Sequence, residues 1–311
     1  NTLSKMTNGT CDNLLIAVYL SAKCPVYFAP AMDLDMYIHP STLDSFKKLE
    51  QFGNTMIPAE SGELASGLSG EGRMAEPENI VAFIEADLES RLPLKGQKIL
   101  ITAGPTYEAI DPVRFIGNHS SGKMGFDIAL SAANLGASVI LVSGPTHCKV
   151  SNPLIKVVSV VSAEEMYIAC HQFYADVDVA IAAAAVADYR PKNVAQQKIK
   201  KAADDFVIEL EKTKDILASL GEQKKNQFLI GFALETENEI ENAKLKIQKK
   251  NLDLIVLNSL QDQGAGFSKP TNKVTFIDKF FNIEPMELKT KEAVADDILN
   301  KVISHFGILQ S

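Results

Sequence analysis

Residues 98–106 read Lys-Ile-Leu-Ile-Thr-Ala-Gly-Pro-Thr. An apolar, β-branched run that ends in glycine and proline is typical of a buried strand followed by a tight turn. Comparable apolar runs recur along the chain, at residues 25–29, 138–142, 155–159, 177–182, 228–232, 252–257 and 273–277. Helical patterns lie between several of them, at residues 42–52, 76–89, 122–135, 163–174, 235–250 and 291–306. Strands that alternate with helices at this spacing predict an α/β fold, with parallel-rich sheets covered by helices on both faces.

The length of 311 residues predicts about two domains. A charged helical pattern ends near residue 90, and Leu-Pro-Leu-Lys-Gly-Gln then precedes the strand at residues 98–102. We therefore expect one domain over residues 1–92 and a second over residues 93–311. Because the chain starts at Asn1, with no signal-peptide pattern, we interpret it as a piece whose first portion is missing.

Composition argues against several classes of protein. The formal net charge of −8 does not suit a nucleic-acid surface, and no apolar run approaches the roughly 20 residues of a membrane helix. The four cysteines are scattered without CxxC or metal-ligand spacing, which fits a reduced, cytoplasmic setting and not a disulfide framework. We therefore expect a cytoplasmic protein with small-molecule ligands, and neither a nucleic-acid nor a membrane partner.

The loop at residues 117–124, Gly-Asn-His-Ser-Ser-Gly-Lys-Met, has the GxxxxGK spacing of a phosphate-binding P-loop. Met124, however, replaces the Ser or Thr that binds magnesium, and the absence of GxGxxG weakens a dehydrogenase interpretation. A helix that begins at Gly122 would still attract phosphate or carboxylate at its N-terminus. Asn118, with Arg114 four residues earlier, could donate to a developing oxyanion. The alternative is an N-capped surface helix with an ordinary connecting loop.

Tiny residues at positions 182–187 end another predicted strand. They would let a flat base or a ribose approach the backbone closely, and Asp188 could then hydrogen-bond to that ligand. The alternative is a tightly packed sheet edge with a helix-capping aspartate.

Two groups of lysines follow. Lys198 and Lys200 project to the same side of an extended segment. Lys246 and Lys250 stand one helical turn apart, so both ammonium groups can address one polyphosphate. The alternative for both groups is ordinary surface charge.

Three segments in order, residues 102–106, 110–114 and 118–125, together resemble phosphopantothenate–cysteine ligase, one half of the bifunctional coenzyme A biosynthesis proteins of bacteria. Further segments occur in this family's order, at residues 184–190, 198–200, 231–236, 246–256, 266–267 and 272–275. The resemblance covers almost all of residues 97–306 and implies a Rossmann-like, parallel-rich sheet for this part.

The resemblance implies a two-step ligation. CTP, bound with magnesium, activates the carboxylate of 4′-phosphopantothenate as an acyl-cytidylate, and the amine of cysteine then displaces CMP. The choice of CTP over ATP rests on the bifunctional bacterial layout, because the residues themselves do not fix the base, and no residue is assigned to the metal. Family members also assemble into oligomers, with the ligase part as a dimer.

The family motifs assign roles to residues of this chain. Lys198 stabilises acyl-cytidylate formation, and Asn118, with Arg114 nearby, serves the conversion of that intermediate. The predicted CTP contacts are Ala184, Ala185, Asp188, Lys198, Thr213, Lys214, Asp215, Ile216, Phe232, Lys246 and Lys250, the last two on the triphosphate.

Residues 1–5, 12–15, 29–37 and 66–74 resemble the second half of the flavin-dependent phosphopantothenoylcysteine decarboxylase domain, which implies a flavodoxin-like fold and FMN. The family's catalytic histidine and much of its flavin-phosphate loop would lie upstream of the first residue, so we expect no decarboxylation by this chain alone.

Two residues depart from the decarboxylase pattern. Asp33 stands where an asparagine is expected for the substrate carboxylate, in the same substrate-binding motif as Met36. Ser66 stands at the catalytic position where many members place a cysteine that protonates the enethiol intermediate. A hydroxyl is a far weaker acid than a thiol, whose pKa is about 8.5.

Two other interpretations remain beside the ligase. One is a Rossmann-like nucleotide-dependent oxidoreductase, against which the missing GxGxxG and the two lysine groups count. The other is a non-catalytic homologue that keeps the fold. Asp33 and Ser66 favour it for the first domain. Four retained residues argue against it for the second: Asn118, Lys198, Lys246 and Lys250.

Overall fold

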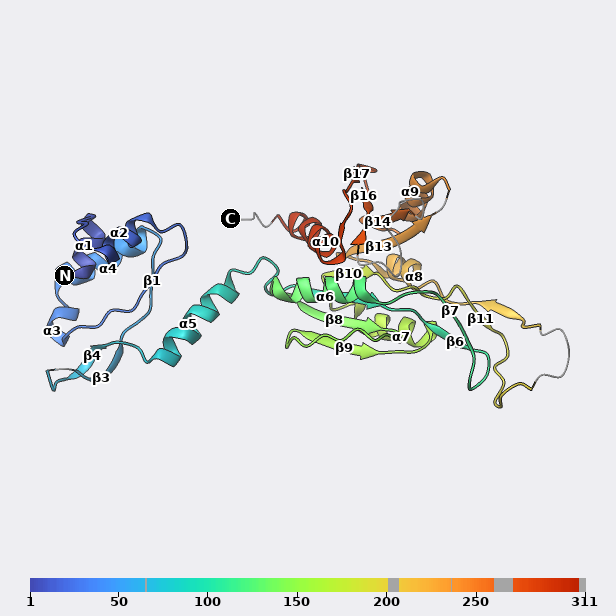
Figure 1. Ribbon diagram of the computed structural model, residues 1–311, viewed down its shortest axis with the longest axis horizontal. Helices are drawn as coiled ribbons and strands as arrows, with labels where there is room; N and C mark the ends of the chain where they lie inside the picture. Colours follow the sequence, from blue (N-terminus) through green and yellow to red (C-terminus); the bar gives the residue numbers. More distant parts are fainter. Residues whose placement is uncertain (65, 201–206, 236, 260–270, 308–311) are drawn as a thin grey trace. The chain divides into compact units, whose positions relative to one another are not determined.

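In the computed structural model, residues 98–103 form the strand β5 (Lys98–Ala103), which belongs to an eight-stranded sheet whose other strands are labelled in Figure 1. The other strands of this sheet are β8 (Ser138–Ser143), β9 (Ile155–Ser159), β10 (Val179–Ala182), β13 (Phe228–Glu235), β14 (Leu254–Ser259), β16 (Val274–Asp278) and β17 (Ile283–Pro285). Their order is β17-β16-β14-β13-β10-β5-β8-β9. From β14 to β9 every neighbouring pair is parallel, whereas β16 and β17 pair antiparallel at one side.

The structure describes residues 1–64, 66–200, 207–235, 237–259 and 271–307. Residue 236 and residues 266–267, which belong to the ligase resemblance, lie outside the described residues. The chain divides into two compact units, Asn1–Arg91 and Leu92–Ser311.

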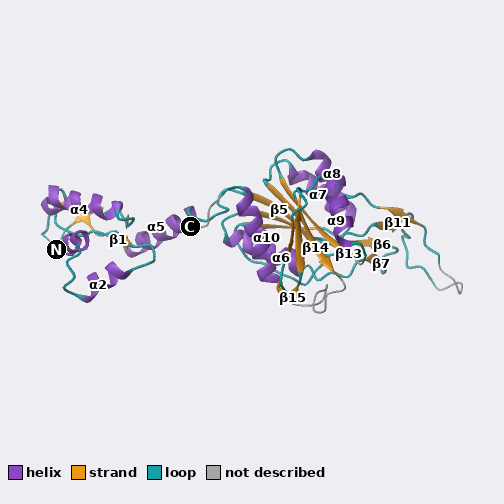
Figure 2. Cartoon of the chain, turned by 90° about the horizontal axis from the view of Figure 1, so that it is seen from above, coloured by secondary structure: helices purple, strands orange, loops and turns teal. Residues whose placement is uncertain are grey.

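Helices cover both faces of the sheet (Figure 2). On one face lie α6 (Lys123–Asn134) and α10 (Lys291–His305), and on the other lie α7 (Ala163–Tyr174), α8 (Ile216–Gln223) and α9 (Glu239–Lys249). Side chains alternate along the strands, so Ile99 and Ile101 pack toward α6 and α10, while Leu100 packs toward α7 and α8. This confirms the predicted parallel-rich α/β fold with helices on both faces.

Several element boundaries differ from the predicted ones. The helix predicted at residues 235–250 begins at Glu239, because β13 continues to Glu235, which pairs with Ser259 of β14. Three two-stranded antiparallel pairs of the unit Leu92–Ser311 went unpredicted: β6 (Tyr107–Ala109) with β7 (Phe115–Gly117), β11 (Tyr189–Pro191) with β12 (Leu210–Lys212), and β15 (Thr271–Asn272) with β18 (Lys289–Thr290). Two- and three-residue strands carry too few positions for a periodic pattern.

The unit Asn1–Arg91 contains the helices α1 (Thr2–Asn8), α2 (Leu14–Ser21), α3 (Leu34–Tyr37), α4 (Pro40–Gln51) and α5 (Pro77–Ser90). Its strands β1 (Tyr27–Phe28) and β2 (Thr55–Met56) are parallel and are joined through α3 and α4, which is the strand–helix–strand connection of flavodoxin-like folds. Strands β3 (Glu60–Glu63) and β4 (Ser69–Arg73) form a hairpin. Among the described residues, no helix has both the length and the apolar character needed to cross a membrane.

Candidate active site

The carboxyl ends of the parallel strands meet at one edge of the sheet, where residues 183–188 continue from β10. This segment is tied to the end of β5 and to the turn that follows it by hydrogen bonds from its backbone N–H groups. The N–H of Ala184 donates to the Oγ1 of Thr102 at 3.1 Å, and the N–H of Ala185 donates to the carbonyl of Gly104 at 2.9 Å. The N–H groups of both alanines are therefore occupied within the protein, and the carbonyl of Ala185 accepts the N–H of Thr106 at 3.3 Å, so the two residues contribute small side chains to the cavity lining.

Helix α6 begins beside the same turn. Its N-cap, Gly122, has a φ of 78°, a conformation that glycine adopts without cost. One turn later, a Cβ on Gly125 would lie 2.6 Å from the Cβ of Ala103, so only glycine lets the helix approach β5 this closely. The sequence thereby places the N-terminus of α6 at the sheet edge.

We expect Gly125→Ala to lower stability by about 1–3 kcal/mol, since the added methyl group must push α6 away from β5. Thermal unfolding of the two proteins measures the difference. Asn134→Ala at the exposed last residue of α6 is the matched control, and should change stability by less than about 0.5 kcal/mol. Equal melting temperatures for wild type and Gly125→Ala would contradict the close approach.

Two cavities lie at this edge and share one wall, made by Ala184, Val186, Asp188 and Phe232. The first, here called the Asn118 cavity, has a volume of about 600 Å³ and is lined by the loop at residues 118–124. The second, the Thr213 cavity, has a volume of about 540 Å³ and is lined by residues 212–217 and Lys250. Two small-molecule-sized spaces therefore meet at the end of β10.

The Asn118 cavity combines amide, hydroxyl and ammonium groups. The Nδ2 of Asn118 donates to the carbonyl of Val186 at 2.9 Å. At the start of α6, the N–H of Gly122 donates to the Oγ of Ser120, and that of Lys123 to the Oγ of Ser121. These contacts orient the helix N-terminus, with its partial positive charge, along the cavity wall.

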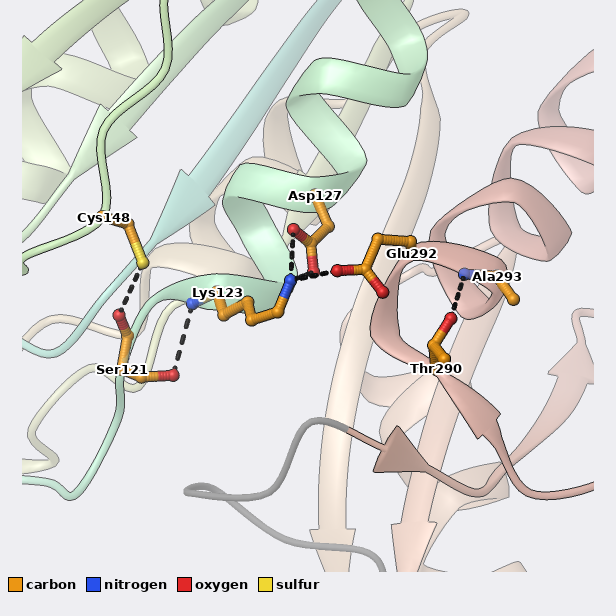
Figure 3. Close-up of polar contacts among 7 residues, drawn as sticks. All are labelled: Ser121, Lys123, Asp127, Cys148, Thr290, Glu292 and Ala293. Carbon is orange, nitrogen blue, oxygen red and sulfur yellow. Dashed lines mark hydrogen bonds and ion pairs between the residues drawn. The ribbon is translucent and has the colours of Figure 1, made fainter.

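Lys123 and Lys291 bring cationic groups to this cavity. Figure 3 shows the Nζ of Lys123 between Asp127, at 2.9 Å, and Glu292. Burial lowers the pKa of Lys123, but its bonds to Glu292 and Asp127 outweigh that effect and raise the pKa. Lys291 is 5% exposed, and burial lowers its pKa, partly offset by the charge of Asp127.

The Thr213 cavity is built around the N-terminus of α8. Thr213 donates through its Oγ1 to the carbonyl of Ala187 at 2.6 Å, and through its N–H to the carbonyl of Asp188 at 3.0 Å. Asp215 caps α8 by accepting the N–H of Ala218, and it also pairs with Lys250 at 2.8 Å. Burial raises the pKa of Asp215, but the bonds from Lys250 and Ala218 outweigh it and hold the pKa below its ordinary value.

Most of the predicted nucleotide contacts thus lie together. The residues that line one or both cavities are Asn118, Ala184, Ala185, Asp188, Thr213, Lys214, Asp215, Ile216, Phe232 and Lys250. Among them, Lys214 is held at its Nζ by Glu164 at 2.7 Å and lies over the ring of Tyr167.

Three predicted residues do not line either cavity in the described part of the chain. Lys246 pairs with Glu235 at 2.5 Å, so the two helical lysines point to different carboxylates. Lys198 is exposed, and Arg114 is bonded to Asp111.

The buried carboxylate of Asp111 fixes the segment that carries Lys198. It accepts the N–H groups of Val113, Arg114 and Ile199, while Arg114 donates to the carbonyl of Ile199 at 3.0 Å. The Arg114 guanidinium holds the pKa of Asp111 far below its usual range. Lys198 is therefore positioned through its neighbour Ile199, on an exposed segment bonded to Asp111 and Arg114.

Lys291, Asn258 and Asn272 line the Asn118 cavity, and sequence reasoning did not single them out. A signal did exist for Lys291, because a lysine at the first position of a helix opposes the helix dipole and needs another reason to be there.

In the unit Asn1–Arg91 the two departures from the decarboxylase pattern lie in contact. The Oγ of Ser66 donates to the Oδ1 of Asp33 at 3.0 Å, and the same oxygen accepts the N–H of Leu34 at 2.7 Å, capping α3. Met36 lies on α3 and is 58% exposed. The structure therefore brings Asp33 and Ser66 together, although they lie 33 positions apart in the sequence.

A twisted, mostly parallel sheet with two cavities at its carboxyl edge, each lined by apolar and polar residues, defines a Rossmann-like α/β protein with a small-molecule site. Residues 94–306 match the family model of the DNA/pantothenate metabolism flavoprotein C-terminal domain, and residues 1–89 match the flavoprotein family model. The chain belongs to the DNA/pantothenate metabolism flavoprotein family.

Individual relatives carry two different names. A cysteine/cysteine sulfinic acid decarboxylase from an unknown prokaryotic organism is 52% identical, over 98% of this chain and 86% of its own length. The coenzyme A biosynthesis bifunctional protein CoaBC of Bacillus subtilis (strain 168) is 43% identical, over 97% of this chain and 75% of its own length. The crystal structure of a CoaBC C-terminal domain has a TM-score of 0.60 and 47% identity, and covers 70% of this chain and 98% of that one.

Proposed function

We propose that the unit Leu92–Ser311 is a phosphopantothenate–cysteine ligase that uses CTP and magnesium, within a coenzyme A biosynthesis protein. The relatives named CoaBC support this pathway. The observation that carries the proposal is the shared wall between two cavities, because an adenylate-type activation must bring a nucleotide and an acid together. We expect the protein to be cytoplasmic and its ligase unit to act as a dimer.

We place CTP in the Thr213 cavity and 4′-phosphopantothenate in the Asn118 cavity. The first holds Asp188, residues 213–216, Phe232 and Lys250, and its volume of about 540 Å³ suits a nucleotide. The second offers the N-terminus of α6 and two lysines to an anion. The α-phosphorus and the acid carboxylate would then meet beside Ala184.

The lysines of α9 would change partners when CTP binds. Lys250 now pairs with Asp215 and Lys246 with Glu235, so each ammonium group is held near the edge by one carboxylate. A triphosphate, with more charge than a carboxylate, would compete for both. The carboxylates thus keep the lysines oriented before the nucleotide arrives.

Magnesium fits this site as an ion carried by the triphosphate. Among the described residues no three His, Cys, Asp or Glu side chains form a metal-binding group. Magnesium usually needs only one or two carboxylates beside the phosphates, and Asp215 is a carboxylate in the Thr213 cavity. When bound, the ion would offset phosphate charge as the carboxylate attacks.

Asn118 and Lys198 would act on the reacting groups. The Nδ2 of Asn118, now on the carbonyl of Val186, lies where it can turn to the oxyanion formed as cysteine attacks the acyl-cytidylate. Lys198 would offset the charge that develops in the first step.

Ligation of 4′-phosphopantothenate to cysteine, followed by mass spectrometry, tests the whole proposal: product should form only with CTP and magnesium, and no product would refute it.

We expect Lys291→Gln to raise KM for 4′-phosphopantothenate by roughly 10- to 100-fold, with a small effect on KM for CTP. The reason is that its buried ammonium group lines the proposed acid cavity, and a bond to a charged group contributes about 1.5–3 kcal/mol. Lys301→Gln, on the same helix and paired with Glu284, is the control and should leave both constants unchanged. An unaltered KM for the acid in Lys291→Gln would remove Lys291 from the site.

The first unit we assign to an FMN-dependent decarboxylase, on the flavoprotein match. None of the described contacts assigns a residue to the flavin phosphate, so the roles proposed here concern Asp33, Met36 and Ser66 alone. With FMN bound, the flavin would supply the oxidation that the decarboxylation of phosphopantothenoylcysteine needs. Ser66 would stand as the proton donor.

A second candidate substrate for this unit is free cysteine. The Oδ1 of Asp33 accepts two hydrogen bonds that the Oδ1 of an asparagine would accept equally well. Aspartate and asparagine therefore differ at this position only in the other terminal atom of the side chain, which is Oδ2 in aspartate and Nδ2 in asparagine. Asparagine carries there an amide donor for a carboxylate, whereas aspartate carries an anionic oxygen that suits an ammonium group. Free cysteine has such an ammonium, but its acylated form does not, and one relative is named a cysteine decarboxylase.

If free cysteine is the substrate, Asp33→Asn should reduce its binding relative to N-acetylcysteine by about tenfold or more, through loss of an ammonium–carboxylate bond. Calorimetric titration of the flavin-loaded protein with both ligands measures this ratio. Asp35→Asn makes the same charge change on the exposed side of α3 and should leave the ratio unchanged. An unchanged ratio in Asp33→Asn would leave the acylated substrate as the only candidate.

A further inference from the structure

A third cavity lies at the opposite edge of the same sheet, where the parallel strands begin. It has a volume of about 510 Å³, and we call it the Lys225 cavity; its polar lining includes Lys224, Lys225, Gln227, Asp253, Lys279 and His305. Strand β13 starts here at Phe228 and ends beside the candidate active site at Glu235. Eight residues of extended chain span about 25 Å, so the two sites are separate.

One buried carboxylate organises the cations of this cavity. The Oδ2 of Asp253 accepts the Nζ of Lys224 at 2.7 Å and the N–H of Leu229 at 2.9 Å, while its Oδ1 accepts the Nζ of Lys279 at 3.1 Å. Burial raises the pKa of Asp253, but these bonds outweigh it and hold the pKa below its ordinary value. An ionised carboxylate thus faces two ammonium groups, and one positive charge remains in excess.

A further cationic group, Lys225, lies beside Asp253 and its two lysine partners. Lys225 is exposed on the cavity rim, and within the described ranges no carboxylate pairs with it. Asp178, another carboxylate at this edge of the sheet, accepts the N–H of Lys98 and does not line the cavity as described. The cations gather here although the chain as a whole carries a formal charge of −8, so general basicity does not explain them.

His305 supplies a flat wall. Its ring stacks on that of Phe228, with centroids 4.3 Å apart, so one face is covered while the residue remains exposed. Burial lowers the pKa of His305, which favours the neutral ring near pH 7. The cavity therefore sets a flat, uncharged surface beside an excess of ammonium groups.

We propose that the Lys225 cavity binds a small phosphate-bearing molecule, with Lys225 and Lys279 on the phosphate and the His305 ring against the organic part. A phosphate offers several anionic oxygens and up to two charges, which suits two ammonium groups better than a single carboxylate does. The concave shape and the overall negative charge of the chain favour a small molecule over a nucleic acid.

The test uses two histidines as local reporters, because His305 lines the Lys225 cavity and His119 lines the Asn118 cavity. The imidazole NMR signals of the full chain are followed during titration with pyrophosphate, inorganic phosphate and CMP. We expect all three probes to shift the His305 signals, with CMP producing the largest shift through its base. No response of His305 to any probe at millimolar concentration would overturn the proposal.

Substitutions of lysines then show which side chains the His305 response to the phosphate probes depends on. Lys225→Gln should weaken the His305 response about tenfold, and since Lys225 pairs with no described carboxylate, the fold should be preserved. Lys279→Gln is the second variant, and Lys244→Gln, paired with Glu241 outside the cavity, is the control that should behave as wild type. An unchanged His305 titration in both Lys225→Gln and Lys279→Gln would overturn the proposal. Ligase turnover in Lys225→Gln should equal that of wild type, so the proposal of this binding site and the proposal of ligase activity can be refuted independently.

Discussion

Replacing Lys198 with glutamine should reduce CTP-dependent activation of 4′-phosphopantothenate by about 100- to 1000-fold, the loss typical of removing one group that stabilises transition-state charge. Lys198 is exposed, but its neighbour Ile199 is bonded through both backbone groups, to Asp111 and to Arg114. The segment that carries Lys198 is therefore held in place, and the assigned role requires the exposed lysine side chain to reach the bound nucleotide from there. Pyrophosphate release, measured at saturating substrates, reports this step directly.

Two variants separate the role of Lys198 from general charge. Lys200→Gln removes an equal charge two residues away on the same exposed segment, and should retain most of the activity. Lys198→Arg keeps the charge and should retain more activity than Lys198→Gln. Wild-type rates in Lys198→Gln would refute the assigned role.

Replacing Asn118 with alanine should separate the two steps of the reaction. Pyrophosphate release in the first turnover should persist, because activation does not need the amide. Conversion of the acyl-cytidylate by cysteine should fall by about 100- to 1000-fold, because the donor for the oxyanion is lost. The measurement is a single-turnover experiment that follows pyrophosphate and CMP separately.

Asn118→Asp is the sharper variant, since it keeps the shape but replaces the amide donor with an acceptor. It should accumulate the intermediate as Asn118→Ala does, whereas Asn134→Ala at the exposed end of α6 should behave as wild type. Equal loss of pyrophosphate and CMP release would place Asn118 in the first step instead.

The sheet followed from local patterns, whereas Phe232 and residues 213–216 were assigned to the nucleotide site by the family resemblance. Buried strands have short apolar runs, and their carboxyl ends must meet at one edge, so Asp188 could be placed at that edge from the sequence. The parallel-rich fold was confirmed for the same reason. The tiny residues at 182–187 do form part of the wall between two cavities.

The charge partners could not be read from the sequence. Lys246 and Lys250 share a helical face, yet Lys246 meets Glu235 at the end of β13 and Lys250 meets Asp215 at the cap of α8. Such pairs depend on which strand end lies beside the helix, and that is decided by the packing of the whole sheet. The burial of Lys291 could not be predicted from the sequence either, since it depends on how α10 packs on α6.

The most direct test of the central claim is pyrophosphate release from CTP in the presence of 4′-phosphopantothenate and magnesium, without cysteine, with ATP in parallel. If two neighbouring cavities bring nucleotide and acid together, release requires the acid and occurs with CTP. No release with either nucleotide would contradict the account.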